Sequence, residues 1–155
     1  MKILIITNLF PNQWQPEKGI FNKQQFLHLS RLCELRVVAP LPWIPRLPTL
    51  NQVAQEEIIE GIKTYHPRYF LTPKIGRSFY GYFFYLGIHN MIERIYNEFN
   101  FDVILATWAY PDAYAASLIS QKLRPGTDRS NVSHSQGVAF PVWIPIVMCS
   151  RLASS

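Results

Sequence analysis

The chain has 155 residues, of which 48% are hydrophobic and 16% charged, with a formal net charge of +5. This length fits one domain with a real core, and the composition excludes an intrinsically disordered chain. No apolar run approaches the ~20 residues of a membrane-spanning helix, and the basic residues are too scattered for a nucleic-acid-binding stripe. We therefore expect no binding to nucleic acid. Because the N-terminus lacks the pattern of a cleaved secretion signal, we also expect a cytoplasmic protein.

The first third of the chain predicts a strand, a loop, a helix and a second strand. The apolar run at 3–7 predicts a buried strand, and the next regular element is a helix over 19–33, with Phe26, Leu29 and Cys33 on one face. A second strand is predicted over 35–39, followed by an extended proline-rich loop. This order is typical of the first unit of a parallel α/β sheet.

The middle of the chain continues the same alternation. A strand or hairpin is predicted around Gly61, a long helix over 78–99, a buried strand over 102–107 and a helix over 112–123. The fold class is therefore α/β: a Rossmann-like parallel sheet with helices on both faces, incomplete at its C-terminal side. We expect two segments, an ordered domain over 1–123 and a poorly patterned tail over 124–155 that leaves the last predicted strand with an unpaired edge.

The loop after the first strand is the first candidate site. Asn8 and Pro11 lie where such sheets bind ligands, and Gly19 stands where the helix begins. Free N–H groups at a helix N-terminus attract phosphate, and a glycine lets a ligand approach the backbone. Simple loop punctuation is the alternative for Gly19, and Trp14 either stacks on a ring or covers the loop.

Two later loops are further candidates. In TWAYPDAY (107–114), Asp112 either caps the following helix or hydrogen-bonds a polyhydroxylated ligand, with Trp108 and Tyr110 offering apolar faces. In YHPRYFLTPK (65–74), His66, Arg68 and Lys74 either contact an anionic acceptor or lie in a solvated loop.

The cysteines, histidines and aromatic residues suggest no further chemistry. Cys33 and Cys149 form no CxxC pair, and the histidines lack metal-ligand spacing, so we predict reduced thiols, no metal and no cofactor. The aromatic stretch over 79–88 is interpreted as core packing, with contact to a membrane surface as the alternative. No nucleophile–base pair stands out, and no catalytic residue is assigned.

Four segments carry a resemblance to a known family: MKILIITNLFPN…GIFNKQQF, LRVVAPLPW, YHPRYF and FDVILATWAYPDAYAA. In this order and spacing they resemble the N-terminal domain of bacterial GT-B glycosyltransferases of family 4 (group 1), over residues 1–123. The resemblance implies two Rossmann-like domains that face each other across a cleft. The N-terminal domain binds a saccharide or lipid-linked acceptor, the C-terminal one binds a nucleotide sugar, and transfer retains configuration without a bound metal.

The resemblance also implies roles for individual residues. Gly19 and Ile20 would approach the donor diphosphate. The acceptor side would be lined by Asn8, Pro11, His66, Arg68, Trp108, Tyr110 and Asp112. The implied pathway is polysaccharide biosynthesis, with peripheral contact at the inner membrane face as an alternative location.

The chain departs from the family after residue 123. RPGTDRSNVSHSQG stands where the family has a strand and a His-Gly-x-Asp-like turn, which suggests a truncated product with a frameshift near that point. We therefore expect no transfer by this chain alone, because the missing half or a partner chain must supply the second wall. A non-enzymatic sugar-phosphate or protein-binding module is the alternative. A dinucleotide-binding domain is disfavoured because GxGxxG is missing.

Overall fold

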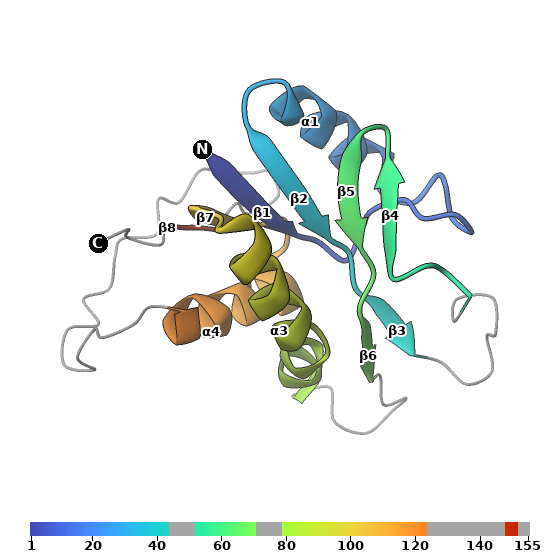
Figure 1. Ribbon diagram of the computed structural model, residues 1–155. Helices are drawn as coiled ribbons and strands as arrows, with labels where there is room; N and C mark the ends of the chain where they lie inside the picture. The colour runs from blue at the N-terminus through green and yellow to red at the C-terminus, as the bar shows by residue number, and fades with distance from the viewer. Residues whose placement is uncertain (44–51, 71–78, 124–147, 152–155) are drawn as a thin grey trace.

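The computed structural model describes residues 1–43, 52–70, 79–123 and 148–151 (Figure 1). The helices are α1 (Ile20–Ser30), α3 (Tyr80–Phe99) and α4 (Tyr114–Leu123), the last preceded by an irregular helical turn over Ala109–Ala113. The strands are β1 (Lys2–Ile6), β2 (Glu34–Val38), β3 (Leu41–Trp43), β4 (Glu56–Ile59), β5 (Ile62–Tyr65), β6 (Arg68–Phe70), β7 (Val103–Ala106) and β8 (Met148–Arg151).

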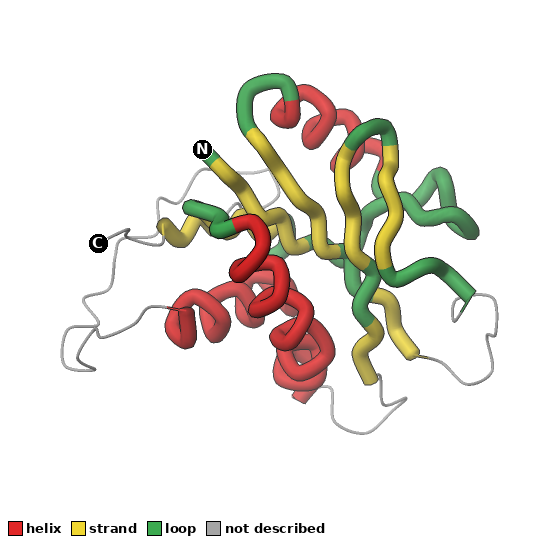
Figure 2. The backbone as a smooth tube through the Cα atoms, in the orientation of Figure 1, coloured by secondary structure: helices red, strands yellow, loops and turns green. Residues whose placement is uncertain are grey.

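The main sheet has the order β4-β5-β2-β1-β7-β8. Its four central strands are parallel, and β4 and β8 run antiparallel at the two edges. Figure 2 shows these strands in yellow and the helices that pack on them in red. β3 and β6 form a separate parallel pair beyond the carboxyl ends of β2 and β5 (Figure 1). This confirms a mixed α/β fold with a mostly parallel sheet.

The two faces of the sheet are covered by different helices. Leu4 and Ile6 of β1 pack in the cluster that contains α3 and α4, whereas Ile3 and Ile5 pack in the cluster that contains Phe26 of α1. Successive side chains of a strand point to opposite faces, so a strand buried on both faces reads as a continuous apolar run. The run predicted over 3–7 is such a strand, and helices on both faces are confirmed.

The helix boundaries differ from the prediction at the first helix. Gly19 has φ 69°, a left-handed conformation, so the helix begins only at Ile20. It ends at Ser30 because the N–H groups of Leu32 and Cys33 both turn back to the carbonyl of Leu29, which redirects the chain into β2. The long helix α3 agrees closely with its predicted apolar spacing, and Ile88, Ile92, Ile95 and Phe99 are buried.

The hairpin around Gly61 is confirmed. β4 and β5 pair antiparallel through a two-residue turn, with Ile59 opposite Ile62. Glu60 and Gly61 both have positive φ, 50° and 86°, as the preferred two-residue hairpin turn requires. The hairpin adds an antiparallel edge to the parallel sheet.

The expectation of an unpaired edge at the last parallel strand was wrong. β8 pairs antiparallel with β7, with Leu105 opposite Cys149, and so satisfies the backbone groups of that edge. The rest of the tail, 124–147 and 152–155, lies outside the described residues. Within the described ranges, no helix is both long and apolar enough to cross a bilayer.

Candidate functional site

The candidate site lies where β1 and β7 end side by side. Because β2 and β5 follow on one side of β1 and β7 lies on the other, the strand order reverses between β1 and β7. Open α/β sheets bind ligands at this point, outside the carboxyl ends of the strands. The next residues, Thr7 and Thr107, are both buried, and their Oγ1 atoms lie 2.8 Å apart.

Asp112 is the charged group of this site. Its side chain is 0% exposed, and its Oδ2 accepts the backbone N–H of Asn8 at 3.2 Å and lies 3.3 Å from Oγ1 of Thr107. Burial raises the pKa of the Asp112 carboxyl from 3.8 to about 7, against the opposite effect of the two hydrogen bonds. The interpretation of Asp112 as a helix cap is wrong, because its carboxylate is turned toward Asn8 rather than back onto the N–H groups of its own helix.

Two buried oxygen atoms of this site have no hydrogen-bond donor among the described residues. They are Oδ1 of Asp112 and Oδ1 of Asn8. Buried polar atoms are nearly always paired with protein, water or ligand. Both oxygens therefore keep the capacity to accept a hydrogen bond, and a sugar hydroxyl would be such a donor once the atoms that cover them move aside.

Gly19 is required by the backbone of its own loop. A Cβ at this position would lie 2.4 Å from the carbonyl oxygen of Leu9, and the positive φ independently favours glycine. Asn22 Nδ2 donates to the same carbonyl at 2.8 Å. These contacts explain the glycine without a ligand. The diphosphate role of Gly19 and Ile20 stays a prediction, and the first turn of α1 carries no acidic side chain that would repel an anion.

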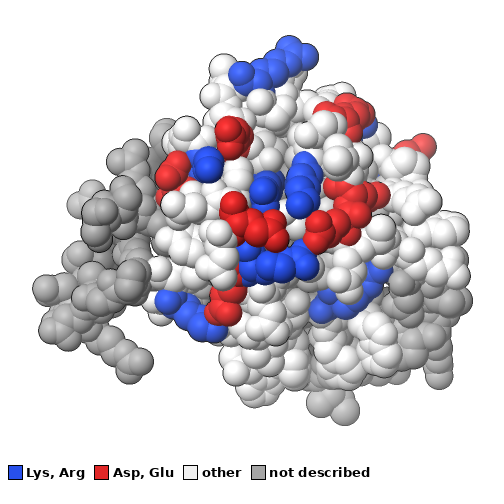
Figure 3. Space-filling view, in the orientation of Figure 1, with Lys and Arg blue, Asp and Glu red and all other residues white. Residues whose placement is uncertain are grey.

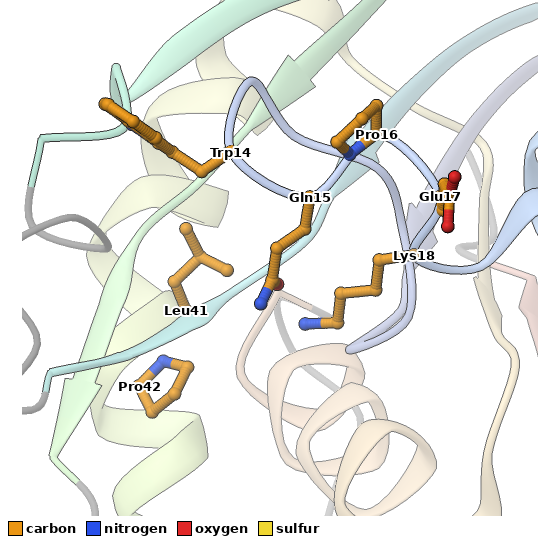
Figure 4. A pocket seen from close by; sticks show the side chains of 7 residues that line it. All are labelled: Trp14, Gln15, Pro16, Glu17, Lys18, Leu41 and Pro42. Carbon is orange, nitrogen blue, oxygen red and sulfur yellow. The ribbon is translucent and has the colours of Figure 1, made fainter.

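The loop between β1 and α1 also lines a cavity of about 790 Å³ (Figure 4). Its lining residues are Trp14, Gln15, Pro16, Glu17, Lys18, Leu41 and Pro42. Of these residues, only Trp14 is predicted from the sequence to contact a ligand. Lys18 belongs to no recognisable motif. The wall formed by β3 could not be predicted, because it depends on a contact between segments far apart in the chain. Pro11, at the start of the loop, is buried.

His66 follows the end of β5, which lies two strands away from β1, and Arg68 is the first residue of β6. His66 is 0% exposed, with Nδ1 2.9 Å from the carbonyl of Ala39 and Nε2 2.5 Å from Oε1 of Glu57. Arg68 donates to the carbonyl of Val53 at 2.8 Å. For His66 the interpretation as a solvated loop is wrong, because its ring is packed inside and both nitrogens have protein partners. Lys74 lies outside the described residues.

Trp108 and Tyr110 lie beside Asp112 and are about half exposed, at 46% and 48%. The Tyr110 hydroxyl accepts the N–H of Gly81 at 2.6 Å, which ties this loop to the start of α3. The aromatic stretch 79–88 is divided: Phe84 and Ile88 are buried, as core packing predicts, while other members of the stretch face outward.

Charges on the face shown in Figure 3 are interleaved rather than segregated. Arg36 pairs with Glu98 at 3.2 Å and Lys63 with Glu56 at 3.4 Å, and Arg94 pairs with Glu56 as well. Within the described ranges no three His, Cys, Asp or Glu side chains gather where they would hold a metal ion.

The structure thus brings Asn8 and Asp112 together, with Trp108 and Tyr110 alongside. His66 and Arg68 belong to a separate hydrogen-bond network, in which His66 is buried and Arg68 partly buried. Comparison with models of protein families, with curated proteins and with solved structures gave no significant match.

Proposed function

We propose that the chain is the acceptor-side half of a retaining glycosyltransferase with a GT-B architecture. One observation carries this proposal: Asn8 and Asp112, each with an unpaired buried oxygen, are hydrogen-bonded to each other at the reversal point of a mostly parallel sheet. The family-like segments add support, because two of them supply these residues. Fold alone does not fix function, so the chemistry of the site carries the proposal.

In this proposal, hydroxyl groups of a saccharide or lipid-linked acceptor donate to Oδ1 of Asp112 and Oδ1 of Asn8. Trp108 and Tyr110 offer half-exposed rings to the apolar faces of the sugar. The diphosphate of the nucleotide sugar approaches the start of α1 at Gly19 and Ile20. A second domain or a partner chain holds the rest of the donor, since transfer needs both substrates in one cleft.

Saccharide binding to the purified chain tests the proposal. A panel of oligosaccharides and nucleotide sugars is titrated while backbone amide NMR signals are followed, first with the unaltered chain and then with Asp112→Asn. Asp102→Asn is the matched control, because Asp102 accepts the N–H of Lys2 at the opposite end of the sheet. The expected result is saccharide binding that Asp112→Asn weakens about tenfold and Asp102→Asn leaves unchanged. Equal binding by both variants, or no binding to any member of the panel, contradicts the proposal.

The alternative function is a module that binds a sugar phosphate or a protein without turnover. The cavity beside Lys18 favours its sugar-phosphate form, because a cation next to an aromatic ring binds such a ligand without transfer chemistry. Adding a separately produced donor-binding domain of a family 4 enzyme separates the two. Transfer or hydrolysis of the nucleotide sugar supports the transferase, and ligand binding without either supports the module.

A further inference from the structure

We propose that the cavity lined by Trp14, Lys18 and Leu41 is a subsite for a pyranose ring that carries a carboxylate or a phosphate. The lining residues support this subsite independently of the proposed function. Only the assignment of the ring to a substrate of the transferase rests on the proposed function.

The lining side chains come from two segments that face each other across the cavity. Gln15 and Lys18 extend into the same space from the loop, and Leu41 and Pro42 of β3 form its opposite wall (Figure 4). Glu17, the acidic residue of this loop, also lines the cavity, and it forms no ion pair with Lys18. The cavity is open to solvent, and its volume of about 790 Å³ lies within the range of small-molecule sites.

The ammonium of Lys18 differs from most other lysine side chains of the described ranges. Three of these pair with carboxylates, Lys23 with Glu60 at 2.7 Å, Lys122 with Glu93 and Lys63 with Glu56, and Lys2 lies over the ring of Phe99. No carboxylate pairs with Lys18 in the part of the chain that the structure describes. Burial lowers the pKa of its ammonium, which shows the cost of leaving this charge partly out of water without a partner. A carboxylate or phosphate on the ligand would supply the missing counter-charge.

The indole of Trp14 adds an aromatic surface to the cavity. It is 47% exposed although it lines a cavity, and so it presents an apolar ring face that water covers in the free protein. A pyranose has one face of C–H groups, which gains from contact with such a ring, while its hydroxyl groups reach the amide of Gln15. An aromatic wall, an amide and a cation together fit a charged sugar better than a free anion or a neutral sugar.

The loop that carries these side chains is held in place before any ligand arrives. Asn12 is buried, and its Oδ1 accepts the N–H groups of Trp14 at 3.0 Å and Gln15 at 2.9 Å. The N–H of Lys18 donates to the carbonyl of Gln15 at 3.2 Å. Because these groups are already ordered, binding loses little conformational entropy.

The loop also joins this cavity to the site at the end of β1. It begins at Asn8, whose N–H donates to Asp112, and it ends at Gly19 before α1. A ligand with a charged ring in the cavity therefore contacts the segment that carries both Asn8 and Gly19, the residues proposed above to contact the acceptor and the donor diphosphate. In the proposed function the charged ring belongs to one of these two substrates.

The test uses the full chain and four probes: glucuronic acid, glucose 6-phosphate, glucose and inorganic phosphate. Binding is measured by calorimetry and by the indole NMR signals, with the Trp14 signal assigned through Trp14→Phe. We expect at least one charged sugar to bind about tenfold more tightly than glucose and than inorganic phosphate. Lys18→Gln should remove this preference, and Lys23→Gln, a neighbouring lysine with its own acidic partner, should preserve it. Trp14→Ala should weaken binding of the charged sugar.

The outcomes separate the possible sources of the anion and the two proposals. Preference for glucuronic acid or for glucose 6-phosphate supports the subsite and identifies the anion as carboxylate or phosphate. Binding of inorganic phosphate as tight as that of both sugars, or a preference that survives Lys18→Gln, overturns it. If the charged sugars bind as expected but Asp112→Asn affects no saccharide, the subsite stands and the proposed function fails. If Asp112→Asn weakens oligosaccharide binding while Lys18→Gln changes nothing, the proposed function stands and the subsite fails.

Discussion

The backbone N–H of Asn8 donates to Oδ2 of Asp112 at 3.2 Å across a separation of 104 residues. This bond closes the gap between the loops that follow β1 and β7. It also leaves the second carboxylate oxygen of Asp112 buried and unpaired. One carboxylate oxygen of Asp112 therefore joins the two loops, and the other lacks a hydrogen-bond donor.

Asp112 should make the protein less stable as the pH rises. The pKa of its carboxyl is about 7 in the folded state and ordinarily 3.8, so the folded state binds more protons between these values. Its contribution to stability is complete below the lower pKa and is lost as the pH rises through about 7. Between pH 5 and pH 8 this loss should reach roughly 2–3 kcal/mol. Urea unfolding of the unaltered chain and of Asp112→Asn at both values measures it, and equal pH dependence of the two proteins would count against the raised pKa.

Part of this architecture could be read from the sequence. The strand at Ile3–Ile6 and the helix α3 were predictable, because burial leaves a continuous apolar run in a central strand and an apolar stripe in a helix. β3 and β6 escaped prediction because each has three residues and Pro42 interrupts the first. The bond between Asn8 and Asp112 and the wall that Leu41 adds to the cavity join segments far apart in the chain, and local patterns do not encode such contacts.

Gly19→Ala should destabilise the protein more than Gly61→Ala. Both glycines have positive φ, and an alanine costs roughly 1–2 kcal/mol in that conformation. At Gly19 the new Cβ would also lie 2.4 Å from the backbone oxygen of Leu9, whereas at Gly61 nothing lies within 4 Å. We expect a loss of about 3 kcal/mol or more at Gly19, since strain and clash add. Thermal or urea unfolding measures the loss of stability of each variant. Equal losses would show that the loop at Gly19 moves to accept the new Cβ without a further loss of stability.

His66→Ala should destabilise the folded protein. The ring is fully buried, and both of its nitrogens lie within hydrogen-bonding distance of groups on other strands or their ends. Removing it leaves the carbonyl of Ala39 and the carboxylate of Glu57 without a partner, a loss of about 3 kcal/mol. His89→Ala is the control, because His89 is partly exposed and its Nδ1 contacts a carbonyl of its own helix. If His66→Ala instead weakens ligand binding at unchanged melting temperature, the acceptor role implied by the family resemblance gains support.

Ser150→Pro should cause the protein to self-associate. β8 pairs with β7 and covers the edge that β7 would otherwise present. Proline removes a backbone donor and disfavours strand geometry, whereas Ser150→Ala preserves both and serves as the control. Sedimentation velocity over a range of concentrations should show larger species for the proline variant, because an unpaired strand edge pairs with another chain. Identical sedimentation of the two variants would mean that β8 does not protect the edge of β7, and that another segment limits association.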